Sequence, residues 1–180
     1  MTSEERRVLL NLARESVAAA ASDGRPPDIS GHSVFKEEGG AFVTLKKTGK
    51  LRGCIGHFSG LGTLGETIRA MAREAAVSDP RFIPVTPGEV DELVIEISVL
   101  SPMKRINPED VVPGLHGLYV RRGPRGGTLL PQVASEEGWD RQTFLEHTCL
   151  KAGLPPDAWL DRGTELLAYT AEVFSETTES

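Results

Sequence analysis

A guanidinium and a thiol lie two residues apart in the stretch Leu51-Arg52-Gly53-Cys54-Ile55-Gly56. Side chains on a strand alternate between its two faces, so Arg52 and Cys54 are expected to share a face if this stretch is a strand. A nearby cation favours thiolate over thiol, and thiolate is the form that attacks electrophiles or binds soft metals. The spacing therefore predicts a reactive or ligand-facing thiol at Cys54.

Two glycines flank this thiol and support a second interpretation of the same stretch. Gly53 and Gly56 leave the backbone uncovered, which is typical of places where a ligand or another chain approaches closely. Glycines within a strand also mark β-bulges, and an isolated cysteine is often a small, inert, buried apolar residue. The residues alone leave both interpretations open.

Length and composition limit the class of protein. The 180 residues, 39% of them hydrophobic, are enough to bury a core in one domain or in two closely packed lobes. A formal net charge of -6 argues against a protein that mainly grips phosphate backbones. Two distant cysteines argue against a disulfide framework, so a reducing, cytoplasmic location is expected. The sequence shows neither a signal-like start nor a membrane-length apolar run, so no membrane association is expected.

Local signals predict three main helices. Thr2 with Glu5, and Thr63 with Glu66, have the spacing of capping boxes, and apolar residues recur at helical spacing after each. The first helix is expected to stop at Asp23-Gly24. The second is expected to stop at Asp79-Pro80, because the residue before proline avoids helical geometry. A third helix is expected from Asp140, as its N-cap, to Gly153.

Strand signals lie between these helices and mostly form hairpins. One hairpin is predicted from Ala41–Lys46 and Leu51–Gly56, with its tip at Thr48-Gly49-Lys50. Further strands are predicted at 93–101, 118–121, 128–130 and 166–174. This order favours an α+β fold with a mixed, mainly antiparallel sheet flanked by helices. The polar tail 175–180 is expected to be frayed.

Several of these stretches together resemble one known family, the AMMECR-one family, whose bacterial and archaeal members are called AmmeMemoRadiSam system protein A. The resemblance covers nearly the whole chain. It rests on five motifs: Phe42-Val43-Thr44-Leu45, Leu51-Arg52-Gly53-Cys54-Ile55-Gly56, Asp79-Pro80-Arg81-Phe82, Glu96-Ile97-Ser98-Val99-Leu100-Ser101-Pro102 and Leu129-Leu130-Pro131-Gln132-Val133-Ala134.

The resemblance carries expectations for fold, partners and substrate. It implies a single domain over residues 1–180, built of two unequal lobes, with the Leu51–Gly56 strand in a cleft between them. It also implies association with a Memo-type protein and a radical S-adenosylmethionine enzyme. The substrate proposed for such a system is an RNA base or a small organic molecule.

One functional hypothesis is a thiol enzyme. Cys54 would be the nucleophile or covalent carrier, and Arg52 would lower its pKa or hold an anionic substrate. Glu96 or His116 would act as general base, provided that the fold brings one of them to the thiol. Alternatively, Glu96 forms an ion pair with Arg52 or Arg81, and His116 is a turn residue.

The other hypothesis is a binding module in which Cys54 only lines the site. Arg52, Arg81, Gln132 and the backbone at Gly53 and Gly56 would then recognise a ligand. Asp79 belongs to the same group of candidates, although Asp79 and Arg81 can also simply cap and brace the second helix. Cys54 and His57 have the spacing of a metal-ligand pair without a second pair, so no metal site is predicted, and no cofactor is expected.

Overall fold

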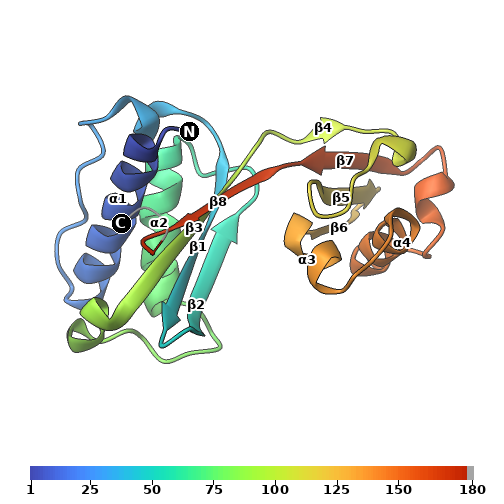
Figure 1. Cartoon of the computed structure of the whole chain (residues 1–180). Coiled ribbons are helices and arrows are strands. Elements are labelled where there is room, and N and C mark those ends of the chain that lie inside the picture. The colour runs from blue at the N-terminus through green and yellow to red at the C-terminus, as the bar shows by residue number, and fades with distance from the viewer. Residues whose placement is uncertain (178–180) are drawn as a thin grey trace. The chain divides into compact units, whose positions relative to one another are not determined.

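The structure, a computed structural model, describes residues 1–177 and divides into two compact units. The first unit contains residues 1–100 and the C-terminal residues from Glu172 onward, and the second contains Ser101–Ala171. Each unit has its own four-stranded sheet with helices beside it (Figure 1). Antiparallel pairs dominate both sheets. The predicted α+β class is therefore confirmed.

The sheet of the first unit has the strand order β2-β1-β3-β8. The predicted hairpin is β1 (Gly40–Lys47) and β2 (Lys50–His57), and β3 (Leu93–Leu100) pairs with the other side of β1. Thr48 and Gly49 form the turn with φ of 49° and 77°, the two positive values that a type I′ hairpin turn needs. β2 is at one end of this order and is therefore an edge strand, and β8 (Ala171–Ser175) is at the other end.

Helices α1 (Ser3–Ala21) and α2 (Leu64–Val77) cover one face of this sheet (Figure 1). Both begin at the predicted capping boxes. At α1, the Glu5 N–H donates to Thr2 Oγ1 at 3.2 Å, and the Thr2 N–H donates to Glu5 Oε2 at 2.8 Å. Thr63 and Glu66 form the same reciprocal pair at α2. Two short 3₁₀ helices, Ser33–Lys36 and Pro87–Glu92, complete the unit.

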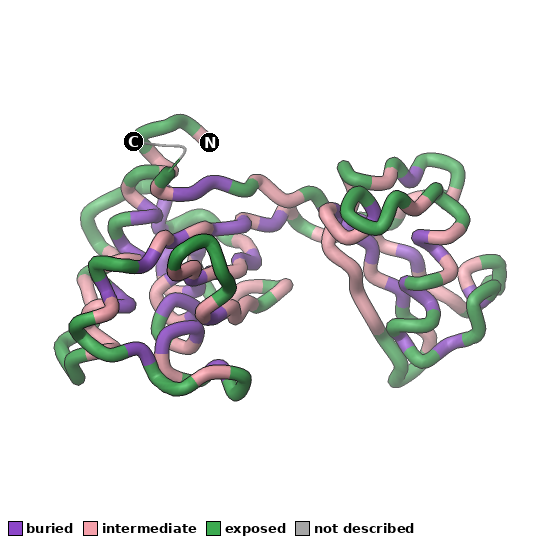
Figure 2. Tube along the Cα trace, turned by 60° about the horizontal axis from the view of Figure 1, so that its bottom comes forward, coloured by how far each residue is buried: buried purple, intermediate pink, exposed green. Residues whose placement is uncertain are grey.

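Alternation along the strands gives this sheet two different faces. Val43 and Leu45 on β1, with Ile95 and Ile97 on β3, are completely buried against the helices (Figure 2). Residues of the opposite parity lie on what we call the helix-free face, and most of them are half-buried. On the three strands nearest the hairpin, that face comprises Phe42, Thr44, Lys46, Cys54, Gly56, Val94, Glu96 and Ser98.

The second unit has a sheet of order β4-β7-β5-β6. α4 begins at the predicted N-cap, where the Thr143 N–H donates to Asp140 Oδ1 at 2.8 Å. Leu118, Val120, Phe144 and Leu145 are at the centre of a separate core. The elements of the unit are β4 (Lys104–Arg105), β5 (Gly117–Arg122), β6 (Arg125–Leu129), β7 (Glu165–Tyr169), α3 (Pro131–Glu136), α4 (Arg141–Lys151) and the 3₁₀ helices Pro108–Asp110 and Ala158–Leu160.

The strand predicted at 166–174 is wrong as a single element. It is divided at Thr170 into β7 and β8, which belong to different sheets. Ala168 buries its side chain in the core of the second unit, whereas Phe174 buries its side chain in the core of the first. At the division, the Thr170 N–H donates to Ser101 Oγ and the Ser101 N–H donates to Thr170 O, both at 2.9 Å. Alternation alone does not reveal that a strand changes sheets.

The first residues of the segment expected to be frayed make contacts with the first unit. Ser175 ends β8, and Glu176 Oε1 accepts a hydrogen bond from Arg14 Nε at 2.5 Å. The Glu176 N–H donates to Ile95 O at 3.1 Å. The carboxylate of Glu176 raises the pKa of Arg14. Residues 178–180 of the predicted tail lie outside the described residues.

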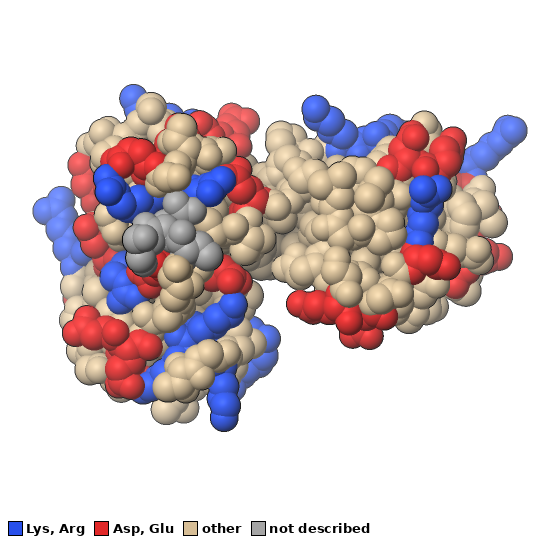
Figure 3. Space-filling view, viewed as in Figure 1, with Lys and Arg blue, Asp and Glu red and all other residues tan. Residues whose placement is uncertain are grey.

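Charged side chains of both signs lie on the visible surface of the protein (Figure 3). Figure 3 shows Lys and Arg interspersed with Asp and Glu over much of the visible surface, with Lys and Arg also gathered at the lower end of the first unit. This pattern agrees with a formal net charge of -6. Within residues 1–177, no helix combines the length and the apolar character that crossing a bilayer would need.

The packing of β2 on α2 can be tested at Gly53. A Cβ added there would lie 2.2 Å from the Ala75 carbonyl oxygen, which cannot move without moving α2. Gly53→Ala is therefore expected to lower the free energy of unfolding by about 1–3 kcal/mol, the usual cost of overpacking. Gly88→Ala is the matched control, because a Cβ there meets no atom within 4 Å. Urea unfolding measures both, and equal stability of the two variants would contradict the close packing.

Candidate functional site

Cys54 lies on the helix-free face in a row of three residues. It pairs with Thr44 on β1, and Thr44 pairs with Glu96 on β3. All three side chains are half-buried. Since neighbouring strands are about 4.8 Å apart, the backbones of Cys54 and Glu96 are separated by about twice that spacing. The thiol and the carboxylate predicted as its base therefore share a face, with Thr44 between them.

Three hydrogen bonds fix Cys54 in place. Thr44 Oγ1 donates to Cys54 Sγ at 3.2 Å. The Cys54 N–H donates to Asp79 Oδ2 at 2.9 Å, and the Cys54 carbonyl accepts from Arg81 Nη2 at 3.1 Å. Because β2 is an edge strand, its outward N–H and C=O groups have no further strand to bind. At this one residue, Asp79 supplies the missing acceptor and Arg81 supplies the missing donor.

The Asp79–Arg81 pair is itself tightly organised. Arg81 Nε donates to Asp79 Oδ1 at 2.9 Å, and Arg81 Nη2 donates to Oδ2 at 2.7 Å, which makes a bidentate pair. The Asp79 side chain is only 2% exposed, whereas that of Arg81 is 54% exposed. Hydrogen bonds from Arg81, and then from the Cys54 N–H, hold the pKa of Asp79 well below its usual range. Asp79 therefore remains a buried carboxylate over the physiological pH range.

This arrangement corrects the interpretation of Asp79 and Arg81 as a cap and brace for the second helix. Ser78 is the C-cap of α2, and its N–H binds Glu74 O. The carboxylate of Asp79 instead reaches across to the edge of β2. The pKa of Arg81 is raised mainly by Asp79, with a smaller contribution from Cys54. Arg81 is therefore the cation that contacts Cys54, through the backbone carbonyl of that residue.

Arg52, the cation expected beside the thiol, binds elsewhere. The register of β1 and β2 shifts at Leu45/Lys46, so Gly53 pairs with Leu45 and Leu51 pairs with Lys46. Arg52 is the extra residue of this bulge, which breaks the alternation expected between Arg52 and Cys54. The bulge that the glycines allowed as an alternative is thus present.

The guanidinium of Arg52 anchors the segment that follows α2. It donates to Ile83 O at 3.0 Å, to Pro84 O at 3.4 Å and, through Nη2, to Glu89 Oε2 at 3.2 Å. Only 12% of the Arg52 side chain is exposed. Arg52 and the backbone N–H of Thr86 lower the pKa of Glu89 to about 2. The contacts of Arg52 are thus structural, and none of those within residues 1–177 reaches Cys54.

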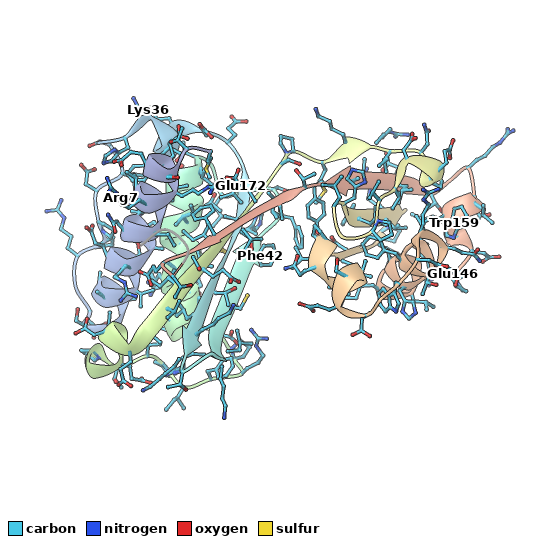
Figure 4. The ribbon with its side chains drawn as sticks, in the orientation of Figure 1. Arg7, Lys36, Phe42, Glu146, Trp159 and Glu172 are labelled. Carbon is cyan, nitrogen blue, oxygen red and sulfur yellow. The ribbon has the colours of Figure 1, made fainter. Side chains whose placement is uncertain are left out.

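The two glycines make room for neighbouring parts of the first unit. Gly53 is buried, and the Ala75 carbonyl of α2 occupies the space where a side chain would begin. At Gly56, an added Cβ would lie 2.2 Å from the ring of Phe42, which projects from β1 on the helix-free face (Figure 4). Phe42 in turn packs edge-on against Phe58, with ring centroids 4.9 Å apart. The close approach predicted at both glycines is therefore made by the protein itself.

Glu96 has a different partner from the one expected. Lys46 Nζ donates to Glu96 Oε2 at 2.9 Å, whereas Arg52 and Arg81 bind Glu89 and Asp79. The expectation of an ion pair with either arginine is therefore wrong. The pairing of β1 with β3 explains the difference, because it places Lys46 diagonally across from Glu96.

The remaining predicted site residues belong to the second unit. His116 Nδ1 accepts a hydrogen bond from the Val112 N–H at 3.1 Å, in the turn that precedes β5. This contact agrees with the alternative of a turn residue. Gln132 lies in the first turn of α3, a helix that the sequence analysis did not predict, and is half-buried.

Three residues that contact the predicted site residues were not predicted from the sequence. Thr44 and Lys46 were missed because their roles depend on strand register, and Glu89 because its partner lies on another element. Their only sequence signal was their place in or near the predicted hairpin and 3₁₀ turn.

Among residues 1–177, no group of three or more His, Cys, Asp or Glu side chains is placed to hold a metal ion.

Comparison with known proteins agrees over nearly the whole chain. A sequence model of the family described as AMMECR1 matches residues 10–174. A protein of Methanopyrus kandleri is 44% identical over 191 residues, covering 98% of this chain and 90% of its own, and one of Thermococcus gammatolerans is 43% identical, covering 93% and 88%. The crystal structure of an uncharacterised protein from Pyrococcus horikoshii matches with a TM-score of 0.84 at 40% identity, covering 98% of this chain and 93% of that one.

Removing the charge of Asp79 tests the edge contact. Asp79→Asn is expected to lower the free energy of unfolding by about 1.5–3 kcal/mol, the typical worth of hydrogen bonds to a charged group. The folded-state pKa of Asp79 is lowered, so its contribution is complete above the unfolded value of about 3.9 and is lost as the pH falls further. The stability difference between the two proteins should therefore be constant from about pH 8 to 5 and narrow below about pH 4.

The control for this measurement is Asp91→Asn, an exposed aspartate in the same unit whose side chain makes no hydrogen bond within residues 1–177. Urea unfolding at each pH gives both differences. The loss of unfolding free energy in Asp79→Asn should exceed that in Asp91→Asn and should shrink toward about pH 2.5. If either expectation fails, Asp79 does not stabilise the protein as a buried carboxylate at the edge of β2.

Proposed function

The chain belongs to the AMMECR1 family, and we propose that its function depends on Cys54 as a thiol that reacts with a small organic substrate on the helix-free face. One observation carries this proposal. Cys54 Sγ accepts a hydrogen bond from Thr44, while the N–H and C=O of the same residue are held by Asp79 and Arg81. Such a thiol is half-exposed and fixed in position, which favours directed attack over incidental reactivity.

The proposed step is addition of the thiol to an electrophilic carbonyl carbon. A carbon–sulfur bond forms, the carbonyl π bond breaks toward oxygen, and the thiol proton passes to that oxygen. The product is a covalent adduct in which Cys54 acts as a carrier, and no oxidant or reductant is consumed. The Thr44 hydroxyl contributes by donating to sulfur, and this hydrogen bond holds Sγ in a fixed orientation for the attack.

Charged groups near the thiol indicate the class of substrate. Arg81 leaves more than half of its side chain exposed beside Cys54, and Lys46 is 38% exposed on the same face of the sheet. Both cations favour a substrate that carries a carboxylate or phosphate substituent. Glu96 lies one strand beyond Thr44, so it would transfer protons to the far end of a bound substrate rather than to sulfur.

The role of Thr44 can be tested by alkylation. Thr44→Val keeps the shape of the side chain but removes the donor, so labelling of Cys54 by iodoacetamide at pH 7 should slow about two- to fourfold. The background is Cys149→Ala, because Cys149 is the other thiol, although it is fully buried and burial raises its pKa. Thr170→Val, at an exposed threonine, is the matched control. Equal labelling rates for the two valine variants would show that the Thr44 hydrogen bond does not affect the reactivity of Cys54.

Ligand recognition without catalysis is a second candidate function. Thr44 is the one side chain within residues 1–177 that hydrogen-bonds to Cys54 Sγ, and the Glu96 carboxylate is taken by Lys46. Arg52 and Arg81 are each paired with a carboxylate. In this alternative, Cys54 lines the binding site and chemistry belongs to another protein.

We further propose, on the basis of the family resemblance, that the protein acts with a Memo-type protein and a radical S-adenosylmethionine enzyme on an RNA base or small organic molecule. Cys54→Ser is expected to abolish substrate conversion by the three purified proteins while leaving their association intact. Mass spectrometry of RNA and small-molecule extracts measures conversion, and size-exclusion chromatography measures association. Full conversion with Cys54→Ser would favour recognition alone, and Cys149→Ala is the control for loss of a thiol elsewhere.

A further inference from the structure

A cavity in the first unit lies away from the helix-free face. It is formed where the C-terminal half of α1 and the N-terminal half of α2 meet the connecting segment Gly24–Pro27. Its volume is about 380 Å³, within the range of sites that hold small molecules. Because α1 and α2 cover the opposite face of the sheet, this cavity is separate from the surroundings of Cys54.

The wall of this cavity is mainly apolar and the rim is basic. Ala19 and Ala20 of α1, Ala70 of α2 and the rings of Pro26 and Pro27 form the wall. Alanine side chains leave the space that larger residues would fill. Arg69 and Arg73, one helical turn apart on α2, stand at the rim. An apolar interior with a few polar groups at one end is typical of a site for a small amphiphile.

The carboxylates around the cavity already have donors within the protein. Glu66 Oε2 accepts from the Thr63 N–H at 2.8 Å and from Thr63 Oγ1 at 3.1 Å. Asp28 Oδ1 accepts from the Ser30 N–H at 3.1 Å, and Asp28 Oδ2 accepts from Ser30 Oγ at 2.5 Å. These hydrogen bonds are the main cause of a lowered pKa at both carboxyl groups, with smaller contributions from the charge of Arg69 at Glu66 and of Arg25 at Asp28. Neither carboxylate therefore requires the nearby arginines as hydrogen-bond partners.

The arginines, in contrast, have side-chain N–H donors that bind no acceptor within residues 1–177. Arg69 is half-buried, yet its one hydrogen bond within residues 1–177 runs from Nη1 to Pro27 O at 3.2 Å. Arg25 shares an adjoining hollow with Arg69 and donates no hydrogen bond within that part of the chain. Arg73 binds its neighbour Glu74 in an exposed pair, a kind that contributes little. A guanidinium has five N–H donors, so most of those at this rim are available to a ligand.

We propose that this cavity binds a small amphiphilic anion. The apolar body of the ligand lies against the alanines and prolines, and its carboxylate or phosphate accepts hydrogen bonds from Arg69, with Arg25 adding positive charge. Carboxylate and phosphate both present two or more acceptor oxygens that a guanidinium can bind through two parallel N–H donors. The inference does not depend on the function of Cys54.

The first experiment titrates sodium hexanoate into the ¹⁵N-labelled full chain and follows backbone amide shifts by NMR. Saturable shifts are expected at Ala19, Ala20 and Ala70. Monohexyl phosphate, the second arm, identifies the preferred anionic group, and saturable binding of either anion supports the proposal. 1-Hexanol has the same chain without the charge and should bind at least about tenfold more weakly. Equal binding of 1-hexanol, or no saturable shift with either anion, would overturn the proposal.

Variants separate the rim from the wall. Arg69→Gln should weaken binding of the preferred anion about tenfold or more, as expected for loss of a charged hydrogen-bond donor. Ala70→Leu should abolish binding by filling the cavity, and leucine is a good helix former, so α2 should fold normally. Arg7→Gln, at an exposed arginine of α1 whose side chain pairs with Glu4 and does not line the cavity, should bind like the wild type. Undiminished binding by Ala70→Leu, or an equal loss with Arg7→Gln, would overturn the assignment.

Discussion

The first unit depends on the hydrogen bonds between the Asp79–Arg81 pair and the edge of β2. An edge strand can leave its outward backbone groups to water at little cost, whereas burying a carboxylate requires complete compensation. Asp79 obtains that compensation from Arg81 and from the Cys54 N–H, so the ion pair and the strand edge stabilise one another. The result is that Cys54, alone among the residues of β2, has its backbone fixed by side chains from outside the sheet.

A second arginine–carboxylate pair fixes the same strand two residues earlier. Arg52 binds Glu89 and the carbonyls of Ile83 and Pro84, so the chain that leaves α2 is attached to β2 both before and after Phe82. Gly53 lies between the two attachments and packs directly on Ala75 of α2. Strand β2 is thus held by helix, loop and ion pairs together, although a single neighbouring strand supplies its ladder.

Sequence reasoning succeeded where the deciding residues are close in the chain. The capping boxes of α1 and α2 involve residues three apart, and the β1–β2 turn is set by Thr48 and Gly49, so all three elements could be predicted. It failed where the partner lies on another element. Asp79 and Cys54 are separated by 25 residues, and nothing local indicates that the carboxylate would bind the strand rather than cap the helix. The bulge at Arg52 also depends on pairing with another strand, so the cation that contacts Cys54 was assigned to Arg52 instead of Arg81.

The bulge at Arg52 decides which face of the sheet carries the thiol. A two-residue turn at Thr48 and Gly49 pairs Lys47 with Lys50, and without a bulge the same count would pair Cys54 with Val43, a residue buried under the helices. The extra residue shifts the register by one, and a shift of one residue exchanges the faces of every side chain beyond it. Cys54 is consequently opposite Thr44 on the helix-free face, while Gly53 takes the position against α2 where no side chain fits. A bulge is common at a sheet edge, but a glycine inside the strand and a carboxylate buried against it each carry a cost. Their combination at one cysteine is consistent with the general finding that local rules are broken where a protein uses a residue.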